Sequence, residues 1–317
     1  MINANKIKEL ISLSTNVVVT SHKNIDLDAL GSILGLYYIS KSLDKEVYIV
    51  IEEEKNELDV KRVLSTIKKL DNISPVCYKD LSIDNNTLLI IADTNRGTRI
   101  QSEKLLKIKN KVLIDHHVKT DESISDLLYE YVDIEESSAT EIVVDLISEL
   151  NVYIPSHIAT IMLAGIYVDT NGFILKTNEN THLCASLLYK FGADTKESQY
   201  LLKQNFNEYK RRQGLIIKTE FYDNIAMAAE STNKYDSTEL AKASDVLLTF
   251  NNINASFVIA KIDDNKVGIS ARSFDTIDVE KVMKHFGGGG HKTYSAAQIE
   301  NKTVEEVKIE LLKYLGV

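Results

Sequence analysis

The stretch NVVVTSHKNIDLDALGS occupies residues 16–32 and decides the fold. Its first five residues form a β-branched run that is typical of a buried strand. A polar turn with His22, Asp26 and Asp28 follows at once. In open α/β folds, the residues that leave the carboxyl end of a parallel strand line the binding site. We therefore expect these side chains at one sheet edge, beside the N-terminus of a helix that starts near Ala29.

Further candidate ligands follow apolar runs that end at residues 92, 114 and 168: Asp93, Asp115, His116, His117 and Asp169. A single aspartate after a strand is commonly a helix cap or a turn residue, so each position is weak evidence by itself. The repetition carries the argument, because carboxylates that crowd at one sheet edge repel each other unless a cation neutralises them.

A purely structural interpretation competes with metal binding in the first turn. Asp26 and Asp28 would then cap the helix, and His22 would be an ordinary turn histidine. The other strand ends favour metal, and their ligands are too many for one ion but fit two. Two bridged ions are the usual device for displacement at phosphorus by water or hydroxide. Imidazole mixed with carboxylate favours manganese, with cobalt, iron or magnesium as substitutes.

Strand-like and helical segments alternate through the first half, which predicts an α/β fold with a doubly wound, mainly parallel sheet. A smaller α/β domain follows, and we expect the active site in the cleft between the two domains. The predicted divisions are a catalytic domain at 1–195, a helical connector at 196–215 and a second domain at 216–317. In the second domain we expect strands at 225–229, 246–250, 256–261 and 266–271, and a final helix at 304–315.

The composition excludes several classes of protein. A chain of 317 residues with 44% hydrophobic content has enough apolar material for two cores, which argues against disorder. A net charge of −9 disfavours a groove for long nucleic acid. Cys77 and Cys184 form no C-x-x-C pair, so a reducing compartment fits. We expect a cytoplasmic protein with no membrane partner, because no apolar run approaches ~18 residues and no signal peptide is recognisable.

A second candidate site lies near the C-terminus. Four glycines at 287–290 precede His291, and Arg272 lies shortly upstream. Glycines let backbone amides approach an anion, Arg272 can fork onto a phosphate, and His291 can donate to it. A glycine run alone is more often a flexible loop, so this interpretation depends on Arg272 and His291.

These motifs together resemble the DHH phosphoesterase superfamily, whose name is spelled here by residues 115–117. The resemblance covers nearly the whole chain and includes a C-terminal DHH-associated domain, the part with the glycine run. Finer features look like the catalytic half of the membrane-bound bacterial cyclic di-AMP phosphodiesterases. They are SHK at 21–23, GIYVDTNGF at 165–173, FGADT at 191–195 and AAQI at 296–299. Counterparts of the membrane-spanning, sensory and degenerate cyclase-like segments are not found in these residues.

The resemblance implies roles for individual residues. His22, Asp26 and Asp93 would bind one manganese ion. Asp28, His116 and Asp169 would bind the other, with Asp93 shared. His117 would orient the leaving oxygen or support the ligands, and Asp115 would brace a histidine. The residues that would hold the phosphate or base of the substrate are Arg272, Gly288, Gly289, Gly290 and His291.

The implied activity is manganese-dependent hydrolysis of cyclic di-AMP to 5′-pApA, with pApA to AMP as a further step. The expected partners are therefore an adenine dinucleotide or very short RNA, and a homodimer is left open. One alternative keeps the chemistry and acts as a short-oligoribonucleotide exonuclease or a 3′,5′-bisphosphoadenosine phosphatase. Another is a nucleotide sensor without turnover, against which the complete ligand set argues.

Overall fold

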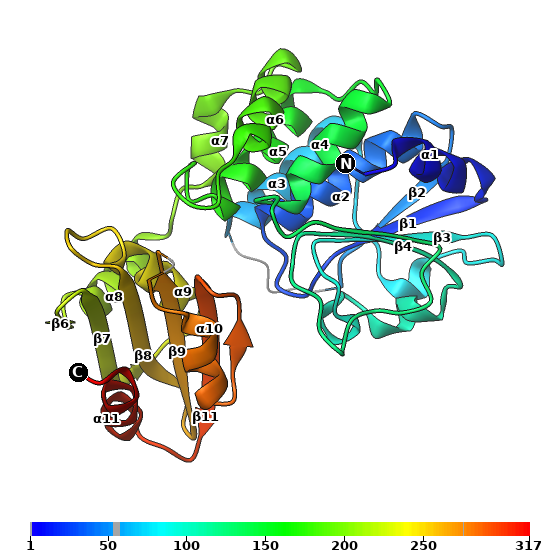
Figure 1. Ribbon diagram of the computed structural model, residues 1–317. Coiled ribbons are helices and arrows are strands. Elements are labelled where there is room, and N and C mark those ends of the chain that lie inside the picture. The colour runs from blue at the N-terminus through cyan, green and yellow to red at the C-terminus, as the bar shows by residue number, and fades with distance from the viewer. Residues whose placement is uncertain (1, 53–57, 275) are drawn as a thin grey trace. The chain divides into compact units, whose positions relative to one another are not determined.

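The structure is a computed structural model that describes residues 2–52, 58–274 and 276–317. The chain divides into two compact units, Met1–Lys203 and Gln204–Val317 (Figure 1). The segment predicted as a connector is shared between them, because α7 (Thr195–Leu201) ends the first unit and α8 (Phe206–Ile216) begins the second. The cleft expected between the domains stays a prediction.

The first unit contains a sheet of five parallel strands: β1 (Asn16–Thr20), β2 (Glu46–Val50), β3 (Leu88–Ala92), β4 (Asn110–Asp115) and β5 (Tyr129–Val132). Their order is β2-β1-β3-β4-β5. Every residue of β1 and β3 is buried, as expected for a parallel sheet covered on both faces. The chain leaves β1 towards one side and β3 towards the other, so the carboxyl ends of these two strands flank a topological switch point.

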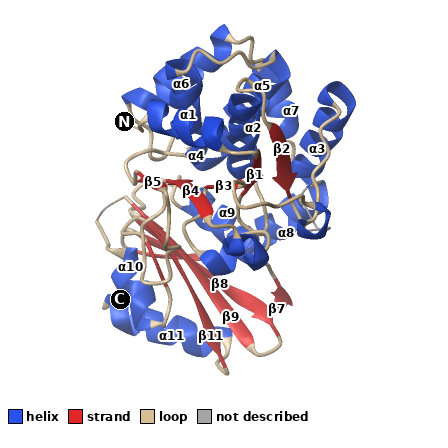
Figure 2. Cartoon of the chain, turned by 90° about the vertical axis from the view of Figure 1, so that its right-hand side faces the viewer, coloured by secondary structure: helices blue, strands red, loops and turns tan. Residues whose placement is uncertain are grey.

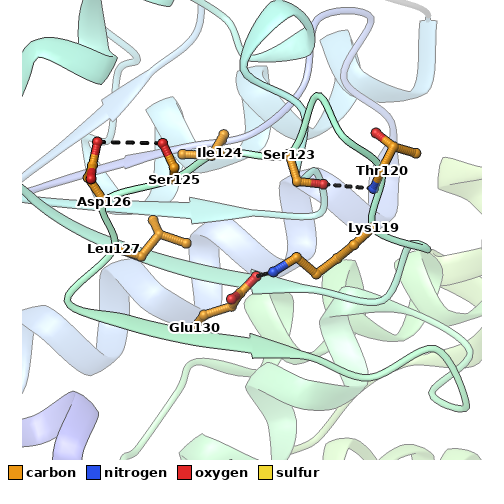
Figure 3. A pocket seen from close by; sticks show the side chains of 8 residues that line it. All are labelled: Lys119, Thr120, Ser123, Ile124, Ser125, Asp126, Leu127 and Glu130. Carbon is orange, nitrogen blue, oxygen red and sulfur yellow. Dashed lines mark hydrogen bonds and ion pairs between the residues drawn. The ribbon is translucent and has the colours of Figure 1, made fainter.

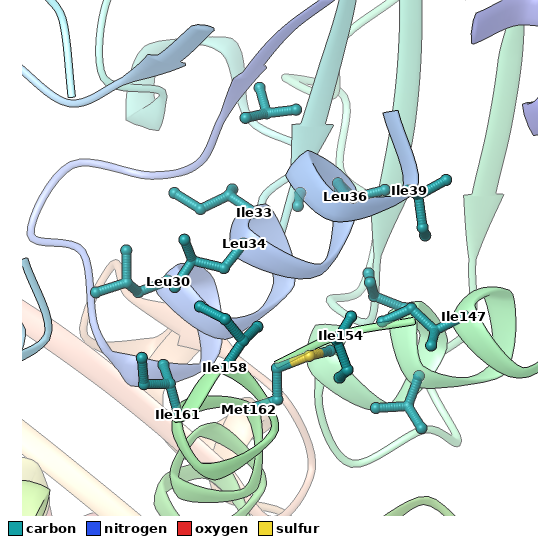
Figure 4. Packing of buried hydrophobic residues seen from close by; sticks show 14 of the residues in the cluster. Leu30, Ile33, Leu34, Leu36, Ile39, Ile147, Ile154, Ile158, Ile161 and Met162 are labelled. Atoms are coloured by element: carbon teal, nitrogen blue, oxygen red, sulfur yellow. The ribbon is translucent and has the colours of Figure 1, made fainter. Parts of the chain in front are cut away.

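Helices cover one face of this sheet (Figures 1 and 2). The central helix, α2 (Leu27–Lys41), is buried along most of its length. Figure 4 shows Leu30 and Leu34 of α2 in the same cluster as Ile158 and Met162 of α5 (Ser156–Asp169). The other helices of this cluster are α1 (Ala4–Leu13), α3 (Leu58–Asp71), α4 (Ala139–Glu149), α6 (Glu179–Lys190) and α7 (Thr195–Leu201).

Short turns and loops cover the opposite face. Val18, Leu89 and Leu113 of the strands pack there with Ile100 and Leu105. The predicted α/β class with a parallel sheet is confirmed, and short turns stand where a doubly wound sheet usually carries helices. The 3₁₀ helices of this region are η1 (Tyr78–Asp80), η2 (Gly97–Arg99) and η3 (Glu103–Lys107).

The second unit is a six-stranded mixed sheet in the order β10-β11-β9-β8-β7-β6, in which only the pair β7 and β8 is parallel. One core lies under α10 (Val279–His285) and α11 (Val304–Leu315), and a second lies under α8 and α9 (Ser237–Leu247). The final helix has the predicted bounds. The strands are β6 (Thr219–Tyr222), β7 (Ile225–Lys234), β8 (Ala255–Asp263), β9 (Lys266–Ser273), β10 (Gly289–Gly290) and β11 (Tyr294–Glu300).

The strand predicted at 246–250 is wrong, because its first residues belong to α9 and the rest form a turn. Asp236 and Glu239 form a capping box that starts this helix, which satisfies its first backbone N–H groups. Its buried residues then recur at helical spacing and end at Leu247. The apolar run at 246–248 resembled a strand because a buried helix face and the turn that follows are both apolar.

Candidate metal centre

The carboxyl edge of the parallel sheet brings together the eight residues that were predicted as ligands or catalytic groups of the first domain. These residues come from the loop after β1, the loop after β3, the end of β4 and the helices α2 and α5. They are therefore far apart in the sequence. These residues are His22, Asp26, Asp28, Asp93, Asp115, His116, His117 and Asp169.

Asp93 lies at the centre of this cluster. Its Oδ2 is 3.2 Å from Nε2 of His22, and its Oδ1 is 3.2 Å from Nε2 of His116. A second carboxylate closes each side, with Oδ2 of Asp26 3.8 Å from His22 Nε2 and Oδ2 of Asp169 3.4 Å from His116 Nε2. Asp93 therefore offers one oxygen to each of two groups of ligand atoms.

The backbone fixes Asp93 in an unusual conformation. Its φ of 58° is left-handed, which is unfavourable for a residue other than glycine and is typical of functional sites. Its N–H donates to the carbonyl oxygen of Ile114 in β4 at 3.0 Å. This hydrogen bond holds the turn after β3 against the neighbouring strand and aims the carboxylate at both histidines.

The first turn caps a helix, and its carboxylates also face the histidines of the cluster. Asp26 caps α2, since its Oδ1 accepts from the N–H of Ala29 at 2.9 Å, while its Oδ2 faces His22. Asp28 is fully buried, and its two oxygens accept from the N–H groups of Ala139 and Thr140 at 2.8 and 2.9 Å. These amides are the N-terminus of α4, whose dipole favours a negative charge.

Backbone carbonyls determine which nitrogen each buried histidine presents. Nδ1 of His22 lies 2.6 Å from the carbonyl oxygen of Lys23, and Nδ1 of His116 lies 3.4 Å from that of Glu136. With Nδ1–H donating to these oxygens, the lone pair of each Nε2 points at Asp93. This is the arrangement that metal-binding histidines adopt.

Burial shifts the pKa values of these groups strongly. It raises the pKa of Asp28 to about 7, with the charge of Asp93 adding to the effect, and it holds the pKa of Asp169 well above its usual range. Burial opposes the charged form of Asp93 as well, but the neighbouring His116 and His22 lower its pKa. Carboxylates that repel one another in a buried site need added positive charge to ionise together.

The donor set fits a divalent metal. Asp93 Oδ1 and His116 Nε2 are buried and face each other, yet within the described part of the chain neither makes a hydrogen bond. A buried acceptor oxygen facing an imidazole lone pair is satisfied by a cation between them. Asp169 is the last residue of α5, so the negative end of that helix dipole adds to the attraction.

His117 differs from its neighbour because it is 45% exposed. Its Nδ1 donates to Oδ1 of Asp115 at 2.8 Å, and the same oxygen accepts from the N–H of His116 at 2.9 Å. Asp115 is fully buried and braces both histidines. This bond fixes the His117 tautomer and leaves Nε2 available for a proton-transfer role, although Nδ1 also lies 3.6 Å from Asp93 Oδ1.

The second unit brings the predicted phosphate-binding residues to one end of its sheet. Arg272 on β9 is opposite Tyr294 of β11, and β11 pairs with the glycines of β10. The guanidinium is already engaged, since Nε donates to Oδ1 of Asp245 at 2.6 Å and Nη1 to the Ala271 carbonyl at 3.1 Å. Arg272 is therefore held in place by its own domain.

The glycines have two different reasons to be glycine. A Cβ on Gly288 would lie 2.2 Å from the carbonyl oxygen of Ala296, and Gly290 has a φ of 156° against β11. Both are required for strand packing. A Cβ on Gly289 would meet nothing within 4 Å, so its open side can admit a ligand. His291 follows in the turn, with its ring stacked on Tyr294 at a centroid distance of 5.1 Å.

A surface pocket of about 420 Å³ lies in the segment that follows His117 (Figure 3). Lys119 lines it but is paired with Glu130, whose Oε1 is 2.6 Å from Nζ. None of the predicted site residues lines this pocket.

Sequence reasoning did not identify the residues that support Asp28. Thr140 contributes its N–H, and its Oγ1 donates to the Asp28 carbonyl at 3.0 Å. Gly165 lets α5 approach, because a Cβ there would lie 2.8 Å from the carbonyl oxygen of Leu27. A glycine within an otherwise apolar helix was the available signal for this close contact.

Two family models match the chain. The DHH family N-terminal domain matches residues 16–166, and the DHHA1 domain matches residues 224–316. The chain is a DHH-family protein with a DHHA1 domain. The DHH match covers β1 to β5 and most of the predicted ligands. The DHHA1 match covers β7 to β11 and includes Arg272 and His291.

Several curated proteins are similar to this DHH-family chain. The cyclic-di-AMP phosphodiesterase GdpP of Bacillus subtilis is 36% identical over 97% of the chain, and PdeA of Listeria monocytogenes, named likewise, is 34% identical over 96%. The chain spans about half the length of these relatives, 48% in each case. A probable bifunctional oligoribonuclease and PAP phosphatase, NrnA, of Streptococcus mutans is 25% identical, with 94% of the chain and 95% of that protein covered.

A solved structure supports the fold. An exopolyphosphatase-related protein from Bacteroides fragilis has a TM-score of 0.82 and 22% identity, with 98% of the chain and 96% of that protein covered. Within the described ranges, no helix is both long and apolar enough to cross a membrane.

Proposed function

We propose that the protein is a manganese-dependent phosphodiesterase that hydrolyses cyclic di-AMP to 5′-pApA. The observation that carries the proposal is the cluster around Asp93, in which carboxylates and imidazoles form groups whose ligand atoms lie within 4.8 Å of one another. Supporting evidence comes from GdpP and PdeA, which are named for this activity and align with nearly the whole chain.

The ligands divide into two sets that share Asp93. One set consists of His22, Asp26 and Asp93, and the other of Asp28, Asp93, His116 and Asp169. Two divalent cations bound there would supply charge that polarises a phosphodiester and lowers the pKa of the attacking water. Manganese suits this mixture of imidazole and carboxylate, with cobalt, iron or magnesium as substitutes.

The protein's own residues then orient the substrate and manage the proton. In the hydrolysis, the oxygen of water forms a bond to phosphorus, the bond from phosphorus to the 3′ oxygen breaks, and that oxygen takes up a proton. His117, which Asp115 holds and which is partly exposed, would donate this proton from Nε2. Arg272, the glycines at 288–290 and His291 bind a phosphate or base of the same substrate.

A second candidate function is the degradation of pApA, short oligoribonucleotides or 3′,5′-bisphosphoadenosine. The favouring observation is the NrnA relative, which is named as a probable oligoribonuclease and PAP phosphatase and aligns with 94% of the chain. Both candidates use the same metal cluster and the same proton donor, so they differ in the substrate alone.

Substrate profiling of purified, manganese-loaded protein tests the proposal. We expect the highest kcat/KM with cyclic di-AMP and a slower second step from pApA to AMP. Higher kcat/KM with pApA, bisphosphoadenosine or a five-mer RNA would contradict this proposal and support the second candidate function. Tight binding of cyclic di-AMP with no turnover under any of the four metals would contradict catalysis and indicate a sensor.

A further inference from the structure

Two arginines that no part of the proposed metal cluster uses lie directly beside it. Arg96 and Arg99 follow Asp93 in the segment that leaves β3. Arg96 precedes η2 and Arg99 ends it, and the N–H of Arg99 donates to the Arg96 carbonyl at 3.0 Å. Arg96 has an extended backbone just before η2 and Arg99 is the last residue of η2, so the two arginines flank one tight turn.

Backbone contacts connect this turn to the loops on two sides of the cluster. The N–H of Lys23 donates to the Arg99 carbonyl at 2.5 Å, and Ile100 forms an antiparallel bridge with His22. At the other end, Arg96 bridges to Ser123, in the loop that follows His117. The turn therefore runs along the rim of the site, between the loop that carries His22 and the loop that carries His117.

The neighbouring polar groups reinforce this placement. Nδ2 of Asn95 donates to the carbonyl oxygen of His117 at 3.0 Å, and the Asn95 carbonyl accepts from the N–H of Ile124 at 2.8 Å. Nε2 of Gln101 donates to the carbonyl oxygen of His22 at 2.6 Å. The segment that carries the two arginines is thus anchored on both sides and is not a free surface loop.

The positive charge of this turn is not neutralised internally. Within the described ranges, neither Arg96 nor Arg99 has a hydrogen-bond or ion-pair partner for its guanidinium. Lys23 lies beside them, with its Nζ donating to the carbonyl oxygen of Thr98 at 3.0 Å, but it is paired with Glu103, whose Oε1 is 3.8 Å from Nζ. Burial and the charge of Arg96 lower the pKa of Arg99, and Glu122 offsets this only in part.

Holding like charges together costs free energy, and a chain with a net charge of −9 has many carboxylates that could have relieved it. Paired guanidinium groups beside a catalytic centre are the arrangement that recognises phosphate, since the planar fork of arginine matches two phosphate oxygens. A dinucleotide carries a second phosphate that the metal cluster does not reach while it holds the first. That phosphate needs its own counter-charge.

We propose that Arg96 and Arg99 form a second phosphate subsite in the DHH domain, which binds the phosphate that is not being cleaved. The subsite rests on the proposed function for the identity of its ligand. It would favour substrates with two phosphates, such as cyclic di-AMP and pApA, over diesters with one. This assigns specificity to the DHH domain itself, in addition to the residues proposed in the DHHA1 domain.

Kinetics on two substrates test the subsite. The double variant Arg96→Gln/Arg99→Gln is compared with wild type on cyclic di-AMP and on bis-p-nitrophenyl phosphate, which has one phosphate. Lys109→Gln is the matched charge control, because Lys109 is exposed and precedes the amino end of β4, away from the site edge. Melting temperatures establish that all variants are folded.

We expect the double variant to lose about 10- to 150-fold in kcat/KM on cyclic di-AMP, the equivalent of one charge-assisted hydrogen bond or more. Its activity on the one-phosphate diester and the activity of the control variant should be unchanged within about twofold. Equal losses on both substrates would overturn the proposal and make the turn a support for the metal ligands. No loss on either substrate would overturn it as well.

A binding measurement separates this inference from the proposed function. We titrate pApA into chelator-treated protein, where no turnover occurs, and expect the double variant to bind at least about tenfold more weakly than wild type. Equal affinities would overturn the subsite even if cyclic di-AMP is the true substrate. Weaker binding by the double variant would support the subsite even if wild type hydrolyses a different nucleotide.

Discussion

The metal cluster of the DHH domain and the glycine strand of the DHHA1 domain hold polar groups in opposite ways. In the cluster, Asp28, Asp93 and His116 are at most 3% exposed, and each is fixed by a backbone group. In the DHHA1 domain, His291 follows a two-residue strand that pairs only with β11, and Gly289 has open space beside it.

The difference indicates a division of labour. Groups that carry charge in a reaction benefit from a dry and rigid site, because electrostatic interactions are stronger there and need no reorganisation. Groups that bind a substrate must instead be reachable from solvent. Substitutions in the first region should therefore affect cleavage of any phosphodiester, and substitutions in the second should affect only substrates large enough to reach it.

The largest effect is expected from Asp93→Ala. Since Asp93 offers one oxygen to each ligand group, its loss should empty both metal positions and lower kcat by several orders of magnitude. Metal content by atomic emission and the cleavage rate of bis-p-nitrophenyl phosphate measure the two effects.

Asp115→Ala is the matched comparison for Asp93→Ala. Asp115 is as buried as Asp93 but contacts histidines and not the shared position, so a loss of about 10- to 100-fold is expected. Mild and equal effects in the two variants would contradict the assignment of Asp93 as the shared ligand.

The next effect concerns His291→Ala. The variant loses binding energy and keeps the ligand cluster, so kcat/KM on cyclic di-AMP should fall about 10- to 150-fold, mainly through KM. Cleavage of bis-p-nitrophenyl phosphate should stay close to wild type, because that diester has no remote nucleoside. Loss of both activities at unchanged metal content would place His291 in the chemical step and break the division of labour.

The sequence predicted the cluster well because parallel strands impose a simple rule. Each of His22, Asp93 and His116 follows a buried strand, and the carboxyl ends of parallel strands meet at one edge. Pattern and topology therefore sufficed to bring these residues together. The same logic predicted α11, whose apolar period and cap lie in consecutive residues.

Features that depend on contacts between distant segments were not predictable. The hydrogen bonds from Ala139 and Thr140 to Asp28 join residues that are 111 and 112 positions apart in the sequence, and no local sequence pattern predicts them. The glycine run was predicted as a ligand loop, but Gly288 is needed for packing against Ala296. The sequence alone does not distinguish a glycine that leaves space for a ligand from a glycine that lets another strand pack closely.

That ambiguity yields a smaller prediction. Gly288→Ala should destabilise the DHHA1 domain by about 2–3 kcal/mol, because its Cβ would lie 2.2 Å from the Ala296 carbonyl oxygen and the strand must shift. Gly289→Ala is the control and should change the free energy of unfolding little, since its Cβ meets nothing within 4 Å. Chemical denaturation measures both. Equal stability of the two variants would mean that β10 does not pack on β11 as described.

The smallest effect tests whether a buried carboxylate in this domain needs a nearby positive charge to stay ionised. Asp93 lies between two histidines that lower its pKa, whereas buried Glu141 faces the hydroxyls of Ser137 and Thr181. Burial raises the pKa of Glu141 to about 8, with Glu136 adding to it.

The direction of the pH effect follows from the protons bound in each state. Between pH 4.5, where the unfolded carboxyl titrates, and pH 8, the folded protein holds a proton on Glu141 that the unfolded chain does not. The stability that this proton confers is complete below pH 4.5 and is lost as pH rises through 8. Glu141→Gln cannot ionise, so relative to wild type it should gain about 2 kcal/mol between pH 6.5 and pH 9. This gain corresponds to roughly 4–8 °C in melting temperature. Glu149→Gln, an exposed change on the same helix, should run parallel to wild type. If Glu141→Gln also runs parallel to wild type, Glu141 is ionised in the fold, and burial without a cationic partner does not control ionisation in this domain.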